Sequence, residues 1–185
     1  MPSNRTTFAD PYYEQLLEGR TINVMGTIEP ALAARVVAEL QYLQHDNGKR
    51  MITLEVFSPG GDVHSGLAII DAARSVGCPI RTVGLGLCAS MGAVILACAA
   101  DKGERYLTAN TEVMLHQVLS GFQGQQSDIQ IAAEHIKALR DRLDVLLARA
   151  MAMPPSEVHE LTDRDRWLSA EEAVELGVAD HVIRP

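Results

Sequence analysis

Short apolar strand-like segments alternate with helix-like segments along this chain. Of all its sequence features, this alternation limits the possible fold classes most. Strand-like runs occupy residues 21–26, 51–57 and 80–85. Apolar residues at helical spacing follow the first two runs, after Pro30 and through residues 67–73. Strands that alternate with helices usually pair in parallel, because each helix returns the chain across one face of the sheet. We therefore predict an α/β fold with a mainly parallel sheet covered by helices.

The second half of the chain continues this pattern with shorter elements. Two strands are predicted at 104–109 and 112–116, followed by a Gly- and Gln-rich loop or extended arm at 120–127. A long amphipathic helix comes next, and its apolar positions are Ile129, Ala132, Ile136, Leu139, Leu143, Leu146 and Leu147. Short helices are predicted at 154–158 and 169–177, and the second begins with the S-x-x-E pattern of a capping box.

Composition limits the partners of this chain. Its 185 residues fit a single domain, 1–185, because no linker or repeat divides them. A net charge of -8 and only 4% aromatic residues argue against nucleic acid and anionic membranes as partners. The first residues lack the apolar stretch of a secretory signal, and glycines interrupt the apolar segment 83–100. We therefore expect a cytoplasmic protein without a membrane span.

Cys78, Cys88 and Cys98 lie ten residues apart and form no C-x-x-C motif. An odd number of cysteines at this spacing indicates neither a disulfide framework nor a zinc site. We expect three buried core thiols in a reducing compartment, and no metal site.

One hydroxyl, that of Ser90, begins the most apolar helix, in the segment C-A-S-M-G-A-V-I-L-A-C at 88–98. The commoner role of a serine at this position is to cap the helix, by accepting an N–H of the first turn. The alternative role is that of a nucleophile, for which the Met91 amide and the helix dipole would stabilise negative charge. The G-x-S-x-G pattern of α/β-hydrolases is absent, so this segment alone does not decide.

Other residue types offer the remaining parts of such a site, each with a plainer alternative. The segment S-P-G-G at 58–61 brings backbone close to a ligand, or is only a tight turn. His116 differs from the other histidines because it closes an apolar strand, although such histidines are more often structural. Asp163 or Asp165 would orient a base, unless both belong to a solvated loop. None of the three lysines lies where a Ser-Lys dyad would need it.

Taken in order, five stretches of the chain resemble the proteolytic subunit of the Clp protease, the ClpP serine peptidase family. They are S-P-G-G at 58–61, A-S-M-G-A at 89–93, M-L-H-Q at 114–117, G-Q-Q-S-D-I-Q-I at 124–131 and D-R-D-R-W-L-S-A-E-E-A-V-E-L-G-V-A-D at 163–180. The resemblance covers the chain from about residue 12 to residue 183, with nearly the family's spacing.

The resemblance implies a Ser-His-Asp triad. In it Ser90 is the nucleophile, His116 the general base and Asp165 the acid that orients the base. The amides of Gly61 and Met91 match the oxyanion hole of the family. The resemblance implies that this site needs no metal or other cofactor. It also implies that ATP is used by a partner unfoldase and not by this chain.

The resemblance also implies an assembly. The family fold is a crotonase-like α/β core of stacked β-β-α units with a projecting strand/helix handle, here at about 118–150, after an N-terminal segment at about 1–19. Two stacked heptameric rings of identical subunits enclose the active sites, so that only unfolded polypeptides reach them. An AAA+ unfoldase of the ClpX, ClpA or ClpC type docks on the ring, and Arg164 couples contact between rings to the triad. Extended peptide is expected against Asp62, Val63, Val118, Leu119, Ser120 and Gly121.

The chain departs from the family pattern near the expected substrate. Phe57 stands where the family usually has Asn, Asp62 replaces a small or apolar residue, and Val118 replaces Pro. Leu87 and Cys88 stand where Gln and Ala are frequent. We expect these changes to alter cleavage preference, with Asp62 disfavouring acidic substrates.

The positions that line the unfoldase pocket also differ. The family has aromatic residues there, whereas this chain has Thr53, Glu55 and Ser75, and only Tyr106 is aromatic. An apolar anchor buries poorly against a carboxylate such as that of Glu55. We therefore expect weakened docking, or a mixed ring in which a second ClpP subunit provides the dock.

Two other functions stay open from sequence. One is a different enzyme on the same core, such as an acyl-CoA enzyme or a phage prohead-type protease, which S-P-G-G-D-V alone permits. The other is an inactive or regulatory ring partner whose triad is held out of alignment.

Overall fold

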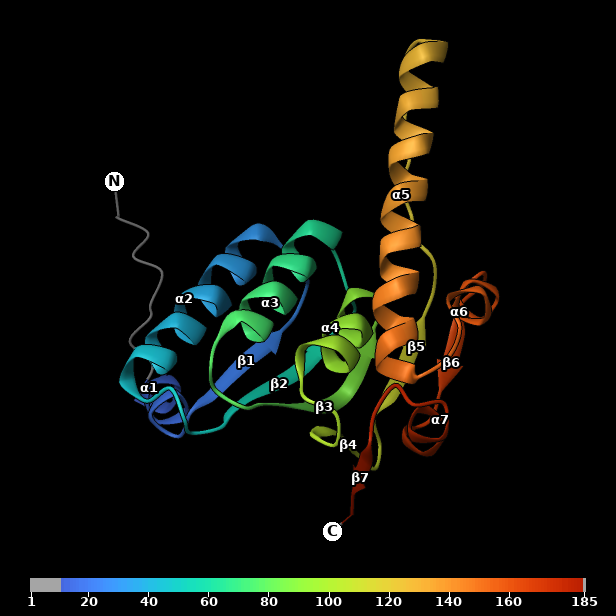
Figure 1. Ribbon diagram of the computed structural model, residues 1–185. Helices are drawn as coiled ribbons and strands as arrows, with labels where there is room; N and C mark the ends of the chain where they lie inside the picture. The colour runs from blue at the N-terminus through green and yellow to red at the C-terminus, as the bar shows by residue number, and fades with distance from the viewer. Residues whose placement is uncertain (1–10, 185) are drawn as a thin grey trace, which may run out of the picture.

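The computed structural model describes residues 11–184, which form seven strands and seven helices (Figure 1). The strands are β1 (Thr21–Met25), β2 (Ile52–Ser58), β3 (Ile80–Ala89), β4 (Arg105–Thr108), β5 (Glu112–Leu115), β6 (Arg166–Leu168) and β7 (His181–Ile183). The helices are α1 (Pro11–Glu18), α2 (Pro30–Asp46), α3 (Val63–Ser75), α4 (Met91–Ala99), α5 (Gln126–Met151), α6 (Pro155–Leu161) and α7 (Ala170–Glu175).

All strands belong to one sheet, in which β1, β2, β3, β4 and β7 are neighbours in that order. Every pair is parallel except β5 with β6, which confirms the predicted α/β class and the mainly parallel sheet. The ten-residue strand β3 changes partner along its length. Its first part pairs with β4 and its last part with β5, from Leu87 opposite Glu112 to Ala89 opposite Met114. The end of β3, from which the chain passes into α4, therefore lies between β2 and β5.

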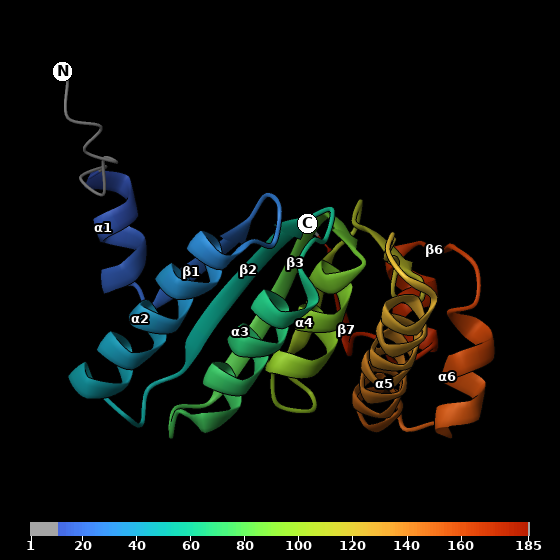
Figure 2. The ribbon, with the colours of Figure 1, turned by 90° about the horizontal axis from the view of Figure 1, so that it is seen from above.

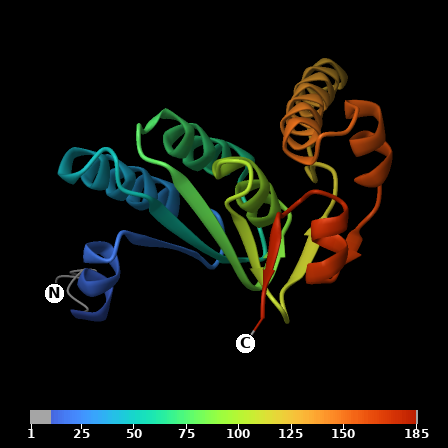
Figure 3. The same ribbon diagram turned by 60° about the horizontal axis from the view of Figure 1, so that its bottom comes forward.

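Helices α2, α3 and α4 lie side by side on one face of the sheet (Figure 2). Figure 3 shows the three helices on the same side of the strands. The strand residues that point toward them are fully buried, as at Ile22 and Val24 in β1 and Leu54 and Val56 in β2. The alternate residues of both strands are at least partly exposed, the pattern of a sheet covered on one face. All nine residues of α4 are buried, so this helix lies in the centre of the core.

Helix α5 projects beyond the sheet (Figure 1) and confirms the predicted long amphipathic helix. Its buried residues all lie in its second half, from Leu139 to Met151, where it packs on the core. Residues 116–125 before it form neither strand nor helix, so the segment predicted as a loop or extended arm at 120–127 ends in the first turn of α5. None of the described helices is long and apolar enough to cross a membrane.

Three short elements escaped sequence analysis: α1, β6 and β7. Both strands have only three residues, most of them at least partly exposed, so neither shows an apolar alternation. Helix α1 lies in a polar segment and is fastened by Tyr13, which donates a hydrogen bond to Glu39 of α2. Residues 1–10 of the expected N-terminal segment lie outside the described part of the chain.

The capping box predicted at Ser169 is confirmed. The Ser169 hydroxyl accepts the Glu172 N–H at 3.2 Å, and the Glu172 carboxylate accepts the Ser169 N–H at 2.8 Å. The three cysteines are free and buried, which confirms the prediction of core thiols.

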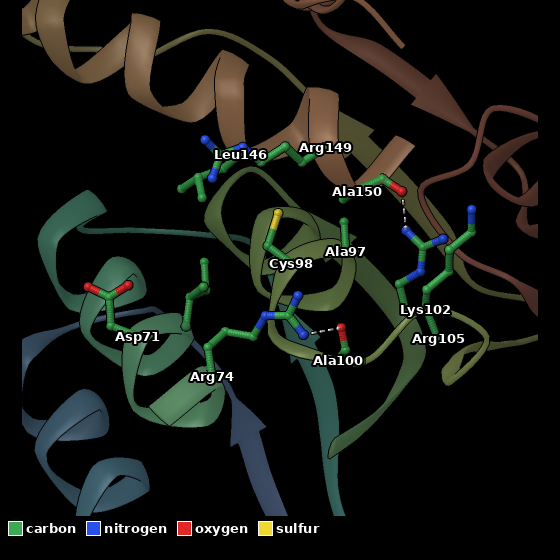
Figure 4. A pocket seen from close by; sticks show the side chains of 11 residues that line it. Asp71, Arg74, Ala97, Cys98, Ala100, Lys102, Arg105, Leu146, Arg149 and Ala150 are labelled. Carbon is green, nitrogen blue, oxygen red and sulfur yellow. Dashed lines mark hydrogen bonds between the residues drawn. The ribbon is translucent and has the colours of Figure 1, made fainter. Parts of the chain in front are cut away.

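A cavity of about 300 Å³ lies between α3, α4 and α5, lined by the basic residues Arg74, Lys102, Arg105 and Arg149 (Figure 4). Two of these cations bind carbonyl groups near the ends of helices. Arg74 donates to Ala100 O at 3.1 Å, and Arg105 donates to Ala150 O at 3.0 Å. Cations stabilise the negative ends of helix dipoles, so the positions of Arg74 and Arg105 in this lining have a structural explanation.

Candidate active site

Ser90 lies between the last residue of β3 and the first residue of α4. Its φ of 54° and ψ of -124° fall in a region that glycine usually adopts, that of the first central residue of a type II′ turn. Its N–H donates to Met114 O at 2.8 Å, which ties the turn to β5. Ser90 occupies the N-cap position of α4, but its side chain makes no capping hydrogen bond, so the predicted capping role of its hydroxyl is wrong. A strained backbone at a residue of this kind often marks a functional position.

His116 directly follows β5 and approaches the Ser90 hydroxyl. Because β5 pairs with the end of β3, with Ala89 opposite Met114, the residues that follow these two strands lie near each other. The distance between His116 Nε2 and Ser90 Oγ is 2.7 Å, that of a good hydrogen bond. The His116 side chain is only 12% exposed.

Asp165 directly precedes β6, and the sheet register brings it opposite His116. Strand β6 runs antiparallel to β5, and the last pair is Leu115 opposite Arg166. The next residues along the two strands, His116 and Asp165, therefore face each other just beyond the paired region. His116 Nδ1 lies 3.6 Å from Asp165 Oδ1, longer than a hydrogen bond, and the Asp165 side chain is 64% exposed. The other candidate, Asp163, instead accepts hydrogen bonds from Gln117.

The glycine pair after β2 forms the predicted tight turn and packs closely against Ser90. The approach of this backbone to a ligand stays a prediction. Gly60 and Gly61 have φ angles of 98° and 149°. A Cβ atom at Gly60 would lie 3.0 Å from Ser90 Oγ. At Gly61 it would lie 2.2 Å from Ile28 O. Only glycine fits here without displacing its neighbours.

The backbone at Gly61 has a free edge. Ile28 N–H donates to Gly60 O and Asp62 N–H donates to Ile28 O, both at 2.8 Å. In a parallel bridge of this kind the N–H and C=O of the central residue, Gly61, point away from Ile28. Met91 is the first residue of α4, where a backbone N–H has no acceptor within the helix. Gly61 and Met91 both line a cavity of about 270 Å³ that also contains Ser90 and His116.

A sequence model of the Clp protease family matches residues 4–185. The chain belongs to the Clp protease family. Membership makes it a ClpP-type peptidase, a hydrolase of a kind that forms oligomers and works with an unfoldase. The seven-stranded sheet and its helices agree with the fold of this family.

The cavity of this ClpP-type chain is largely apolar. Its apolar lining comes from Val63, Val94, Met114, Val118, Leu119 and Leu143. Three residues expected at the substrate, Val63, Val118 and Leu119, therefore lie at the cavity, with Leu119 mostly exposed. Ser120 and Gly121 are exposed and are not part of its lining.

Asp62, a departure from the family pattern, caps α3. Its Oδ1 accepts hydrogen bonds from the Ser65 hydroxyl at 2.6 Å and from the Ser65 N–H at 2.8 Å. These two bonds lower the pKa of the Asp62 carboxyl, so it is charged at neutral pH. Asp62 follows Gly61 directly, which places this negative charge next to the free backbone edge.

Arg164 lies beside the candidate acid but does not contact it. Its side chain is 93% exposed, and its nearest carboxylate is that of its neighbour Asp163, at 3.7 Å. Within one chain, the described contact of Arg164 with a carboxylate is therefore an exposed ion pair with its neighbour, which contributes little stability.

Three of the expected unfoldase-docking positions, Thr53, Glu55 and Tyr106, lie on the partly exposed face of the sheet, whereas Ser75 is the exposed last residue of α3. Glu55 is opposite Val83, and Val83 is opposite Tyr106. The Tyr106 ring lies between two basic side chains, with His181 at 4.9 Å and the Arg81 guanidinium at 4.8 Å. The only aromatic residue at these positions is thus surrounded by polar groups.

Two residues of the site were missed by sequence reasoning. Ser58, which is fully buried, donates to Gly26 O at 2.6 Å and accepts the Gly60 N–H at 3.0 Å, so it shapes the glycine turn. Gln117 joins the strand that carries His116 to the turn that carries Asp165. The only sign of Gln117 in the sequence was its place at the end of the motif M-L-H-Q. That motif did not predict which residue the Gln117 side chain contacts.

Within residues 11–184, one group of side chains is close enough to hold a metal ion: Asp141, Asp144 and His159. His159 Nδ1 lies 2.8 Å from Asp144 Oδ2, and Lys137 donates to Asp141 at 2.7 Å. These side chains therefore already have partners, and the bond between His159 and Asp144 links α6 to α5.

Proposed function

We propose that the chain is a serine endopeptidase subunit of a Clp protease. His116 takes the Ser90 proton as the hydroxyl attacks a peptide carbonyl, and Asp165 orients His116. An acyl-enzyme forms, His116 returns the proton to the leaving amine, and water then hydrolyses the ester. The observation that carries this proposal is the 2.7 Å distance between Ser90 Oγ and His116 Nε2, with no capping bond competing for the hydroxyl.

The backbone around Ser90 suits the charge that develops in this reaction. The amides of Gly61 and Met91 bind the oxyanion, since one faces away from Ile28 and the other begins a helix. An extended peptide pairs with the free edge at Gly61 and is covered on its other side by the segment from Val118 to Gly121. An apolar side chain of the substrate fills the cavity.

The proposed assembly is a barrel of two heptameric rings that admits unfolded polypeptides. An AAA+ unfoldase of the ClpX, ClpA or ClpC type uses ATP to unfold the substrate polypeptides and to deliver them to the barrel. Glu55 and the polar surroundings of Tyr106 weaken the docking of an apolar anchor, so this ring depends on a second ClpP subunit for efficient docking. A binding titration of the purified ring with the host unfoldase tests this dependence, and tight binding without a second subunit would exclude it.

One observation favours a second candidate, an inactive ring partner. Asp165 stops 3.6 Å from His116 Nδ1 and is largely exposed, so the acid is not in hydrogen-bond contact in a single chain. In this alternative, contact between rings at Arg164 moves Asp165 into hydrogen-bond distance of His116. A ring that lacks this contact stays inactive.

Labelling with a fluorophosphonate probe tests the proposed function. The intact ring is expected to be labelled at Ser90, and Ser90→Ala is expected to abolish labelling. Ser156→Ala, at an exposed serine on α6, is the matched control and retains it. An intact double ring that is not labelled would support the inactive partner instead.

A further inference from the structure

The turn that carries Asp165 is attached to the rest of the chain on both sides. After Asp165, Arg166 enters β6 and pairs with Leu115 of β5. Before it, Thr162 is almost fully buried and its N–H and hydroxyl both donate to Val158 O at 2.9 Å. Between these anchors lie only residues 163–165, so the anchor at each end determines where the Asp165 carboxylate stands.

Gln117 provides much of the anchor that precedes Asp165. Its N–H donates to Thr162 O at 2.7 Å, and its side-chain Nε2 donates to Asp163 O at 2.9 Å. The same nitrogen lies 3.3 Å from Asp163 Oδ1, which Arg140 of α5 also approaches at 3.5 Å. Gln117 directly follows His116, so these bonds join the neighbour of the base to the turn that carries the acid.

We propose that Gln117 is a positioning residue, whose side-chain amide holds the turn at Asp163 so that Asp165 faces His116. This inference rests on the proposed function. Asp165 itself supplies little restraint, because it is largely exposed and makes no hydrogen bond to His116 in the single chain. Without the side-chain amide of Gln117, Asp163 loses its bonds to the neighbour of His116 and keeps the longer contact with Arg140. The Gln117 N–H still binds Thr162 O, so the start of the turn stays attached while Asp163 is freed.

Replacement of Gln117 by leucine removes the amide and keeps nearly the same volume. We expect Gln117→Leu to lower the rate of fluorophosphonate labelling at Ser90 at least about tenfold, because small misplacements of catalytic groups are costly. In peptide hydrolysis kcat is expected to fall with little change in KM. Gln44→Leu is the matched control, since Gln44 also makes one hydrogen bond to backbone, from the Gly77 N–H, far from Ser90. It is expected to label as wild type does.

A double-mutant cycle with Asp165→Asn separates positioning from a general loss of stability. If Gln117 acts through Asp165, adding Gln117→Leu to Asp165→Asn changes the residual labelling rate by less than about twofold. Equal effects of Gln117→Leu in both backgrounds would overturn the inference, as would unchanged labelling of the single variant. Ring assembly and the thermal midpoint are measured for each variant, and a Gln117→Leu effect that merely follows unfolding also overturns it. A wild-type ring that is not labelled would refute the proposed function itself, and the inference with it.

Discussion

A side chain at Gly60 would place its Cβ atom 2.5 Å from the Cβ atom of Ser90. The same atom would lie 2.9 Å from Ala89 O, so neither the serine nor the end of β3 leaves room for it. The glycine turn after β2 and the turn at Ser90 are thus packed directly against each other, and the position of one depends on the other.

Gly60→Ala is therefore expected to displace Ser90 and to slow its labelling at least about tenfold. The overpacking and the positive φ at residue 60 are also expected to lower the free energy of unfolding by about 1–3 kcal/mol. Labelling rates and denaturant unfolding measure the two effects. Gly48→Ala is the control, because the nearest atom to its Cβ, Gln44 O, is 3.5 Å away. A Gly60→Ala variant that labels as fast as the control would contradict the proposed close packing.

Asp62→Asn tests the effect of a negative charge beside the proposed substrate edge. Asparagine caps helices about as well as aspartate, so α3 is expected to keep its cap while the charge is lost. We expect the ratio of cleavage rates for basic and acidic peptides to fall roughly fivefold, from loss of about 1 kcal/mol of charge interaction. Rates for paired peptides that differ by Lys or Glu at each position measure this ratio. It is expected to shrink at high salt in the wild type. An unchanged ratio in Asp62→Asn would show that Asp62 does not face the substrate.

The buried pair between Arg105 and Asp180 predicts acid sensitivity. Burial raises the pKa of Asp180, but the hydrogen bonds from Arg105 outweigh it and hold that pKa below its usual value. A lowered pKa in the folded state adds stability above the unfolded pKa of about 4, and this stability is lost as the pH falls through the lowered pKa.

Asp180→Asn leaves the Arg105 side chain, which is only 4% exposed, without its counterion at 2.6 Å. We expect a loss of about 3 kcal/mol at neutral pH. The difference from wild type is expected to shrink as the pH falls below about 4, where the unfolded chain takes up the proton, and to be smallest below the lowered pKa of folded Asp180. Urea unfolding at several pH values measures both. The exposed pair of Arg74 with Asp101 provides the control, and Asp101→Asn is expected to cost less than about 1 kcal/mol. Equal losses in the two variants would show that burial does not strengthen the first pair.

The buried thiols are expected to resist alkylation. Burial raises the pKa of both Cys88 and Cys98 to about 12, so almost no reactive thiolate exists near neutral pH. Iodoacetamide at pH 8 is expected to leave both cysteines unmodified in the folded protein and to modify them after unfolding. Peptide mass mapping measures each site. Rapid modification of Cys98 in the folded ring would show that the basic cavity beside it opens to solvent.

The elements with strong periodicity could be predicted from sequence, and those without it could not. Strands β1 and β2 and helix α5 have enough residues for their apolar spacing to be visible. Strand β6 has three residues, two of them exposed, because it is an edge strand paired only with β5. Its residues showed no alternation, and 163–168 therefore resembled a solvated loop.

The candidate site shows the same limit. The residue types alone left the role of Ser90 undecided and did not choose between Asp163 and Asp165, and the triad was predicted from the resemblance to the ClpP family. Their distances depend on pairing between strands that are far apart in sequence, such as β5 with β6, which no local pattern specifies. The same holds for Gln117, whose partner Asp163 is 46 residues away.

Helix α4, whose nine residues are all buried, supports Ser90, whereas Asp165 lies at the surface on a short turn. The serine and the acid of the candidate site therefore differ in how firmly the rest of the chain holds them. Ser90 is partly exposed at its cavity, but the helix that follows it is held on all sides by the core, so binding at the surface does not easily move it. The Asp165 carboxylate lies at the surface, where a neighbouring subunit or partner can contact it. Regulation by such a partner would therefore act by moving the acid and not the serine.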